Sequence, residues 1–190
     1  MGGRGAAGSG GSPDVIGAVA MRAAMDTLDD VGWPTITAHE RRIAASMRRG
    51  LAAILGVHLL GPGAATETLP VATFTVAGVP HALVAARLAA EHAIGVGHRR
   101  FGADPDLIRL LGLTGEDVHR YRDQVRRGDR RAVPGAIRAS AGINTTDEDV
   151  QQLVAAVAWV AADDPPVPYH QDPFTGDFFP AASTLPEWAA

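Results

Sequence analysis

Short segments rich in β-branched residues alternate with amphipathic segments along most of the 190-residue chain, and this alternation constrains the fold most. The run "VATFTVA" at 71–77 indicates a strand, because branched side chains fit a pleated sheet. Between 43 and 55, apolar residues recur three and four positions apart, which indicates one buried face of a helix. Helices alternating with short strands predict an α/β fold, a small mixed sheet covered by helices.

Capping and breaking residues set the expected helix boundaries near the start of the chain. Ser12-Pro13-Asp14 opens a first helix, since serine caps, proline suits the first helical position and aspartate favours the helix dipole. That helix is expected to run to about Asp30 and to stop before Gly32. Thr37 and Glu40 have the spacing of a capping box and predict the start of a second helix.

Further along, two threonines and an Asp-Pro pair mark three more helix starts, and the expected order of elements is α-α-β-β-α-β-α-α-β-α. These helices begin at Asp104-Pro105, Thr114 and Thr146. Composition and periodicity predict the remaining elements: strands at 57–60, 71–77, 93–98 and 136–142, and a helix at 81–92.

Composition also divides the chain into three parts. Residues 1–11 are glycine-rich and are expected to be flexible. Residues 12–163 carry the predicted helices and strands, and they are numerous enough to bury one core. Residues 164–190 are rich in proline and aromatic residues and are expected to pack as an irregular arm.

Charge and hydropathy argue against several classes of function. A net charge of −4 gives no electrostatic case for nucleic acid, and the arginines of 115–131 fit a solvated helix face. No apolar run approaches the roughly 20 residues of a membrane helix, and 1–13 lacks the apolar middle of a signal peptide. With no cysteine, the chain can form neither disulfides nor thiolate metal sites, which fits a cytoplasmic location. The seven histidines show no metal-ligand spacing.

The absence of lysine is the strongest restriction on chemistry, because all seventeen basic residues are arginine. Lysine is the side chain that forms Schiff bases with carbonyl groups. A mechanism that requires such a lysine cannot be completed by this chain, and we expect no catalytic residue of that kind in it.

Four segments, in this order, resemble the C-terminal part of the class V aminotransferases, fold-type I pyridoxal-phosphate enzymes that include the cysteine desulfurases. They are "GGSPDVIGAVAMRAAMDTLDDVG", "TAHERRIAASMRRGLAAILGVHLLGP", "IGVGHRRFGADPDLIRLLG" and "GAIRASAGINTTDEDVQQLVAAV". The tail "YHQDPFTGDFFP" resembles the end of one branch of the family. The resemblance covers roughly residues 10 to 180 and implies the fold of that family's small C-terminal domain.

The resemblance implies pyridoxal phosphate as cofactor, an amino acid as substrate and a homodimer as assembly. In the family, a large N-terminal domain carries the lysine that binds the cofactor, so the chain is expected to be inactive alone. The lysine would come from a missing N-terminal region, a mis-assigned start or a separately encoded half. The alternative is a non-catalytic remnant or protein-interaction domain with the same fold, marked by exposed apolar residues on the first helix.

Arg138 is the first candidate site residue and lies in the expected strand "AIRASAG". An arginine among small and apolar residues is unusual there, because burying an unpaired charge is costly. The resemblance implies that Arg138 binds the α-carboxylate of the substrate, a contact that suits a planar guanidinium. The alternative is a structural ion pair with Asp147 or Asp149.

Ser12 is the candidate for the cofactor phosphate. It follows a glycine-rich turn at an expected helix start, where free N–H groups favour a phosphate. The resemblance implies that its hydroxyl binds the cofactor phosphate, and the alternative is a plain helix cap.

His98 is the second candidate for substrate binding, and its alternative is a turn residue bonded to the backbone. In the cysteine desulfurases the matching turn holds the cysteine that accepts sulfur. The positions that match this cysteine here are Arg100 or Gly102, so the chain offers no persulfide-forming nucleophile. Aminotransfer, lyase or racemase-type chemistry on an amino acid stays open.

Overall fold

The computed structural model describes residues 14–62, 68–100, 105–162 and 164–181, and the chain divides into two compact units after Ala38. The predicted order of elements is confirmed, and two further short strands follow it. The helices are α1 (Val15–Val31), α2 (Trp33–Ala52), α3 (His81–His92), α4 (Pro105–Leu110), α5 (Gly115–Arg126) and α6 (Asp147–Ala162). The strands are β1 (Val57–Leu60), β2 (Val71–Val76), β3 (Gly97–Arg100), β4 (Gly135–Ser140), β5 (Tyr169–Gln171) and β6 (Phe178–Pro180). None of the helices in these ranges is both long and apolar enough to cross a membrane.

The first helix ends where the sequence predicts, but the second begins earlier. Gly32 has a φ of 85°, a conformation that suits glycine, and it ends α1. Helix α2 then begins directly at Trp33, and Pro34 is tolerated because a first-turn residue needs no N–H partner. The predicted capping box is therefore wrong, since Thr37 and Glu40 lie inside α2.

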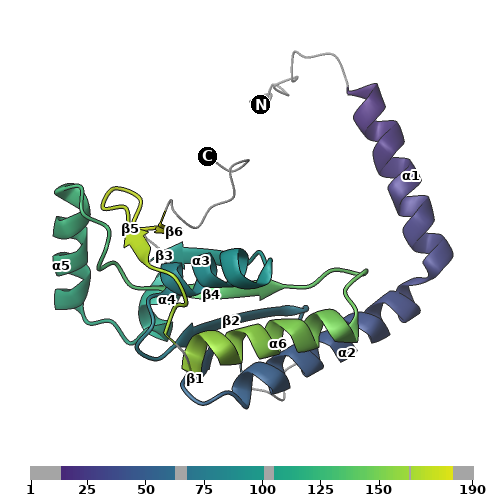
Figure 1. Ribbon diagram of the computed structural model, residues 1–190. Coiled ribbons are helices and arrows are strands. Elements are labelled where there is room, and N and C mark those ends of the chain that lie inside the picture. Colours follow the sequence, from purple (N-terminus) through teal and green to yellow (C-terminus); the bar gives the residue numbers. More distant parts are fainter. Residues whose placement is uncertain (1–13, 63–67, 101–104, 163, 182–190) are drawn as a thin grey trace, which may run out of the picture. The chain divides into compact units, whose positions relative to one another are not determined.

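The main sheet has the strand order β1-β2-β4-β3, and neighbouring strands are antiparallel at each of its three contacts (Figure 1). The α/β fold with a small sheet is confirmed, but the predicted mixed sheet is wrong. Strands β2 and β3 run in the same direction and are joined through α3. They do not pair, because β4 lies between them and is antiparallel to both.

One face of this sheet is buried beneath α2, α3 and α6. Side chains alternate between the two faces of a strand, and those on the helix side include Phe74 of β2 and Ile137 of β4, both fully buried. The opposite face carries Thr73, Arg138 and Ser140, and Arg138 and Ser140 are exposed. We call this second side the open face. The helix residues of the core are Ile43, Met47, Leu51, Val84, Leu88, Val150, Leu153, Ala156, Val157 and Val160.

The third strand begins four residues later than the sequence predicts. Ala93 adopts a left-handed conformation with a φ of 55°, and its N–H donates to the carbonyl groups of Leu88 and Ala89. This cap ends α3 and uses the first residues of the predicted 93–98 strand for the turn. Strand β3 therefore starts at Gly97, which becomes the neighbour of Arg138.

The tail forms a β5–β6 hairpin, so the predicted irregular arm is wrong for its described part. The carboxylate of Asp172 accepts the N–H groups of Phe174 and Thr175 at 2.8 and 2.7 Å, which closes the turn. Arg130 then donates its N–H to the carbonyl of Pro173 at 2.8 Å. Contacts with residues about forty positions away thus define the hairpin, and local composition does not reveal them.

A buried ion pair within α3 binds a tyrosine of this hairpin. The Arg87 side chain is 1% exposed, and its Nε and Nη2 donate to the two carboxylate oxygens of Glu91 at 2.9 and 3.1 Å. Tyr169 of β5 donates its hydroxyl to Glu91 Oε1 at 3.0 Å. Arg87 Nη1 donates to the carbonyl of Val160 at 3.3 Å, near the end of α6. We call this group the Arg87–Glu91 clamp.

The clamp makes stability sensitive to alkaline pH. Burial, and then the hydrogen bond to Glu91, raise the pKa of Tyr169 from 10.0 to about 12. The folded state thus holds the phenol proton more tightly than the unfolded state. The free energy of unfolding should fall as pH rises from about 10 towards 12. Urea unfolding across this range, compared with Tyr169→Phe, measures the effect. A Tyr169→Phe variant that loses as much stability as the wild type would contradict it.

Candidate functional site

The pairing of three strands holds Arg138 on the open face. Arg138 pairs with Thr73 of β2 on one side and with Gly97 of β3 on the other, and Thr73 pairs in turn with Leu60 of β1. Residues directly opposite each other in antiparallel strands point to the same side of a sheet. Leu60, Thr73, Arg138 and Gly97 therefore form one row across all four strands.

The guanidinium of Arg138 lies over Gly97. A Cβ built on Gly97 would stand 3.7 Å from both Nε and Nη2 of Arg138. Arg138 is exposed, and within the described ranges its side chain has no hydrogen-bond or ion-pair partner. An accessible planar cation of this kind can bind a carboxylate through two parallel hydrogen bonds.

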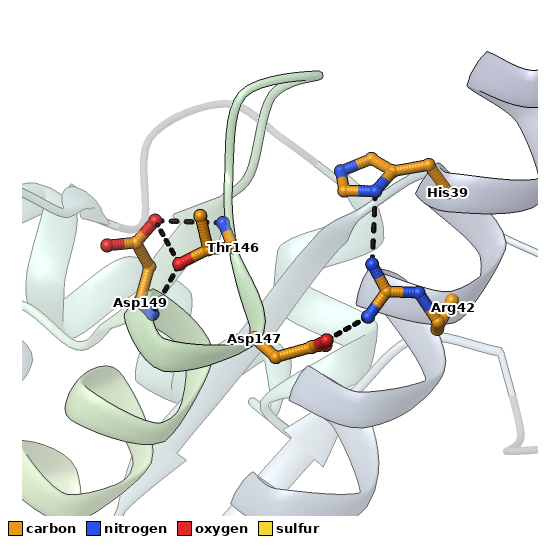
Figure 2. A network of polar contacts seen from close by, with 5 residues as sticks. All are labelled: His39, Arg42, Thr146, Asp147 and Asp149. Atoms are coloured by element: carbon orange, nitrogen blue, oxygen red, sulfur yellow. Dashed lines mark hydrogen bonds and ion pairs between the residues drawn. The ribbon is translucent and has the colours of Figure 1, made fainter.

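The two aspartates considered as partners of Arg138 bind other residues (Figure 2). Asp147 forms an ion pair with Arg42 of α2, and Arg42 Nη2 lies 3.2 Å from Nδ1 of His39. Asp149 accepts the N–H and the hydroxyl of Thr146 at 2.8 and 3.0 Å. In the described structure, neither aspartate is therefore paired with Arg138.

The same contacts fix the start of α6 and the turn that follows β4. Thr146 caps α6 as predicted, since the N–H of Asp149 donates to its hydroxyl at 3.1 Å. Hydrogen bonds from the backbone and side chain of Thr146 lower the pKa of Asp149. The N–H of Gly142 donates to the hydroxyl of Thr145 at 3.0 Å. The strand that carries Arg138 is thus tied to α2 and α6 just beyond its last residue.

His98 lies on the opposite side of the sheet from Arg138. It pairs with Ile137, a core residue, so both side chains face the helices. Its ring is 5.6 Å from that of His81 in α3, and its Nε2 lies 3.6 Å from a carboxylate oxygen of Asp177. The structure therefore does not bring His98 and Arg138 together. The alternative of a turn residue bonded to the backbone is not seen either, because His98 lies within β3 and its Nδ1 has no hydrogen-bond partner among the described residues.

The remaining candidates fall on or near undescribed segments. Ser12 lies outside the described residues. The cap of α1 in the described chain is Asp14, which accepts the N–H of Gly17 at 2.9 Å. Gly102 also lies outside the described residues, and only the backbone of Arg100 is described, in β3.

Two clefts open near the sheet, and Arg138 lines neither. One, of about 280 Å³, lies between segment 93–96 and the β4–α6 turn and includes Ser140, Thr145 and Asp149. The other, of about 360 Å³, lies at the start of α3 and includes His81 and Arg131. In the part of the chain that the structure describes, no three histidine, aspartate or glutamate side chains gather to hold a metal ion. A pocket around Arg138 would need a wall from outside these residues.

Sequence reasoning missed two features of this region. Gly97 lay within the predicted strand 93–98, and only the strand register reveals that Arg138 lies over it. The Arg87–Glu91 clamp had a signal, an Arg and a Glu four residues apart in the helical "HALVAARLAAEH", but such pairs are usually solvated.

A family model described as aminotransferase class-V matches residues 7–153, which include β3, Arg138 and the start of α6. The chain belongs to this family. Its class V relatives include a probable cysteine desulfurase 2 of Mycobacterium leprae, 29% identical, and a probable cysteine desulfurase of Pseudomonas putida, 30% identical. Each match extends over 147 residues, covering 77% of this chain and 30% of the relative.

A solved structure supports the same relationship. The cysteine desulfurase CsdA of Escherichia coli, crystallised as its S-sulfonic acid form, matches with a TM-score of 0.58 and 26% identity. The match covers 78% of this chain and 31% of CsdA. The chain thus has a fold found in a fold-type I pyridoxal-phosphate enzyme, and it spans about a third of the length of these class V proteins.

Proposed function

We propose that this chain forms the C-terminal part of a pyridoxal-phosphate enzyme of the class V aminotransferase type, acting on an amino acid in the cytoplasm. The observation that carries the proposal is Arg138, an accessible guanidinium without a described partner on the open face of the sheet. A cation held in this way can bind the α-carboxylate of an amino acid and fix the orientation of its α-carbon.

The residues of this chain suit the part of such a site that binds the substrate, but they do not provide the lysine that holds the cofactor. Arg138 is suited to a carboxylate, but the seventeen basic residues include no lysine that could hold pyridoxal phosphate as a Schiff base. When bound, this cofactor serves as an electron sink for the substrate. The lysine is therefore supplied by a large domain, in the same polypeptide or in a separate one, and Ser12 contributes to the phosphate site.

The residues of this chain restrict the reaction type without fixing it. The relatives are described as cysteine desulfurases, but this chain has no cysteine to accept sulfur. Aminotransfer or lyase chemistry on an amino acid needs no such thiol from this chain. His98, which faces the helices, is then a structural residue near the site, and Arg138 alone contacts the substrate carboxylate.

The test is a substitution at Arg138 in the native enzyme, meaning the polypeptide or complex that contains this chain in its own cells. Arg138→Gln should lower kcat/KM for the amino acid about 100-fold, because bidentate charge-assisted hydrogen bonds are lost. The matched control is Arg122→Gln, an exposed arginine on α5. Kinetics unchanged by Arg138→Gln would contradict the proposed role, as would a native enzyme that contains no lysine-bearing domain.

A second function has one observation in its favour. Helix α1 has no buried residue in the structure, and its apolar Val15, Ile16, Val19 and Met21 are each at least 65% exposed. Such a helix face suits a protein partner, so the chain could serve as a non-catalytic interaction domain. In that case Arg138→Gln would alter no amino-acid turnover, and the experiment above separates the two functions.

A further inference from the structure

We propose that Gly97 is a positioning residue for Arg138, and that the missing side chain at this position sets the direction of the guanidinium. This inference rests on the proposed function, since it concerns how Arg138 meets a carboxylate. Gly97 is the first residue of β3, an edge strand, and it lies directly beside Arg138.

The backbone does not require glycine at this position. Seven glycines of the described chain have a positive φ, which favours glycine, but Gly97 is not among them. Its conformation is therefore open to any residue. Glycine weakens a strand, and a β-branched residue would be preferred here on the strand's own account. The reason for the glycine has to lie in what surrounds it.

Among the described residues, Arg138 lies nearest to the space above Gly97. The three nearest atoms to a Cβ built there all belong to Arg138: its carbonyl oxygen at 3.6 Å, and its Nε and Nη2 at 3.7 Å. These distances are ordinary contacts, so a methyl group would fit. A branched side chain would extend further and meet the guanidinium itself.

The other neighbour of Arg138 explains why the guanidinium lies on this side. Thr73 flanks Arg138 on β2, and its branched side chain stands on the same face of the sheet. Arg138 thus has a branched side chain on one side and none on the other, and it lies over the empty one. We attribute to this asymmetry the position of Nε and Nη2 of Arg138 over β3.

The proposal separates two variants at Gly97. In the native enzyme, Gly97→Val should raise KM for the amino acid about ten-fold, since the displaced guanidinium loses a charge-assisted hydrogen bond. Gly97→Ala should stay close to the wild type. The matched control is Gly95→Val, because a Cβ built on Gly95 meets nothing within 4 Å. Gly97→Val should not lower the melting temperature, as valine favours a strand.

A double-mutant cycle shows whether Gly97 affects KM through Arg138. In an Arg138→Gln background, Gly97→Val should have no further effect on KM, whereas an effect of the same size as in the wild type would overturn the inference. Wild-type KM in Gly97→Val, together with a large loss in Arg138→Gln, would overturn the inference and leave the proposed function standing. Unchanged kinetics in Arg138→Gln would contradict the proposed function itself.

A measurement without any variant keeps the inference testable if Gly97→Val fails to fold. In the NMR spectrum of this chain, the Cα protons of Gly97 should show nuclear Overhauser contacts to the δ protons and the Nε–H of Arg138. The Nε of Arg138 lies 3.7 Å from a Cβ built on Gly97, which brings the neighbouring protons within range of such contacts. Their absence would overturn the proposed role of Gly97, whatever the kinetics show.

Discussion

Replacing Glu91 by alanine is expected to lower the free energy of unfolding by about 3–5 kcal/mol, because it leaves the Arg87 guanidinium buried without its carboxylate. The side chains of Arg87 and Glu91 are only 1% and 10% exposed, so the pair is largely shielded from water. The change also removes the acceptor of the Tyr169 hydroxyl and loosens the hairpin from α3. Urea unfolding followed by circular dichroism measures this loss.

Two controls show whether burial causes the effect. Asp123→Ala breaks an exposed ion pair with Arg126, at 2.9 Å, and should cost less than about 1 kcal/mol. Replacing both members of the clamp, as Arg87→Met with Glu91→Leu, should cost far less than Glu91→Ala, because no buried charge is left unpaired. Equal losses for Glu91→Ala and Asp123→Ala would show that the clamp behaves as a surface pair.

Gly50→Ala is the second substitution with a large expected effect on stability. It should destabilise the fold, although replacing glycine by alanine usually stabilises a helix. Alanine in place of glycine stabilises an exposed helix by about 1 kcal/mol. Here a Cβ on Gly50 of α2 would stand 2.5 Å from Cγ2 of Val154 in α6 and 3.3 Å from Cγ1. A β-branched side chain cannot easily turn aside, so the helices must move apart. We expect a loss of about 1–3 kcal/mol.

A double-mutant cycle checks the reason for this loss. Val154→Ala removes the two methyl groups that meet the new Cβ, so Gly50→Ala should be neutral or stabilising in that background. Gly115→Ala is the matched control, because a Cβ built on this helix residue meets nothing within 4 Å. A loss of equal size in the presence and absence of Val154 would mean that the contact between α2 and α6 is not its cause.

The two stability effects act at different ends of α6, and only one of these ends lies near Arg138. Helices α2 and α6 pack beside the strands, and the Arg42–Asp147 pair links α2 to the start of α6 (Figures 1 and 2). Their packing therefore supports the turn beyond Arg138. A variant that separates the two helices should disturb that turn, whereas loss of the clamp acts at the other end of α6, near Val160.

Local signals in the sequence predicted the order of the elements and several of their ends. Thr114 and Thr146 were identified as caps because a hydroxyl and a carboxylate three residues apart suffice to satisfy the first N–H groups of a helix. Gly32 ended α1 because its backbone conformation suits glycine. These features depend on a few consecutive residues, so they can be read without the fold.

Two of the failures share a physical cause, which is contact between residues distant in sequence. The β5–β6 hairpin depends on Arg130 and Arg131, and the antiparallel sheet depends on β4 inserting between β2 and β3. The predicted capping box at Thr37 was wrong for another reason. Helix α2 already begins at Trp33, with Pro34 in its first turn.

The α/β class follows from the alternation of segments along the sequence, and the family follows from the resemblance of four segments. Arg138 is a candidate that this resemblance implies. The sequence also determined that this chain supplies no lysine and no cysteine. The folded chain was needed to show that Arg138 and His98 point to opposite sides of the sheet and that Gly97 lies beneath the guanidinium. The direction of a strand side chain is fixed by register with its neighbours, and here those neighbours are about 40 and 65 residues away.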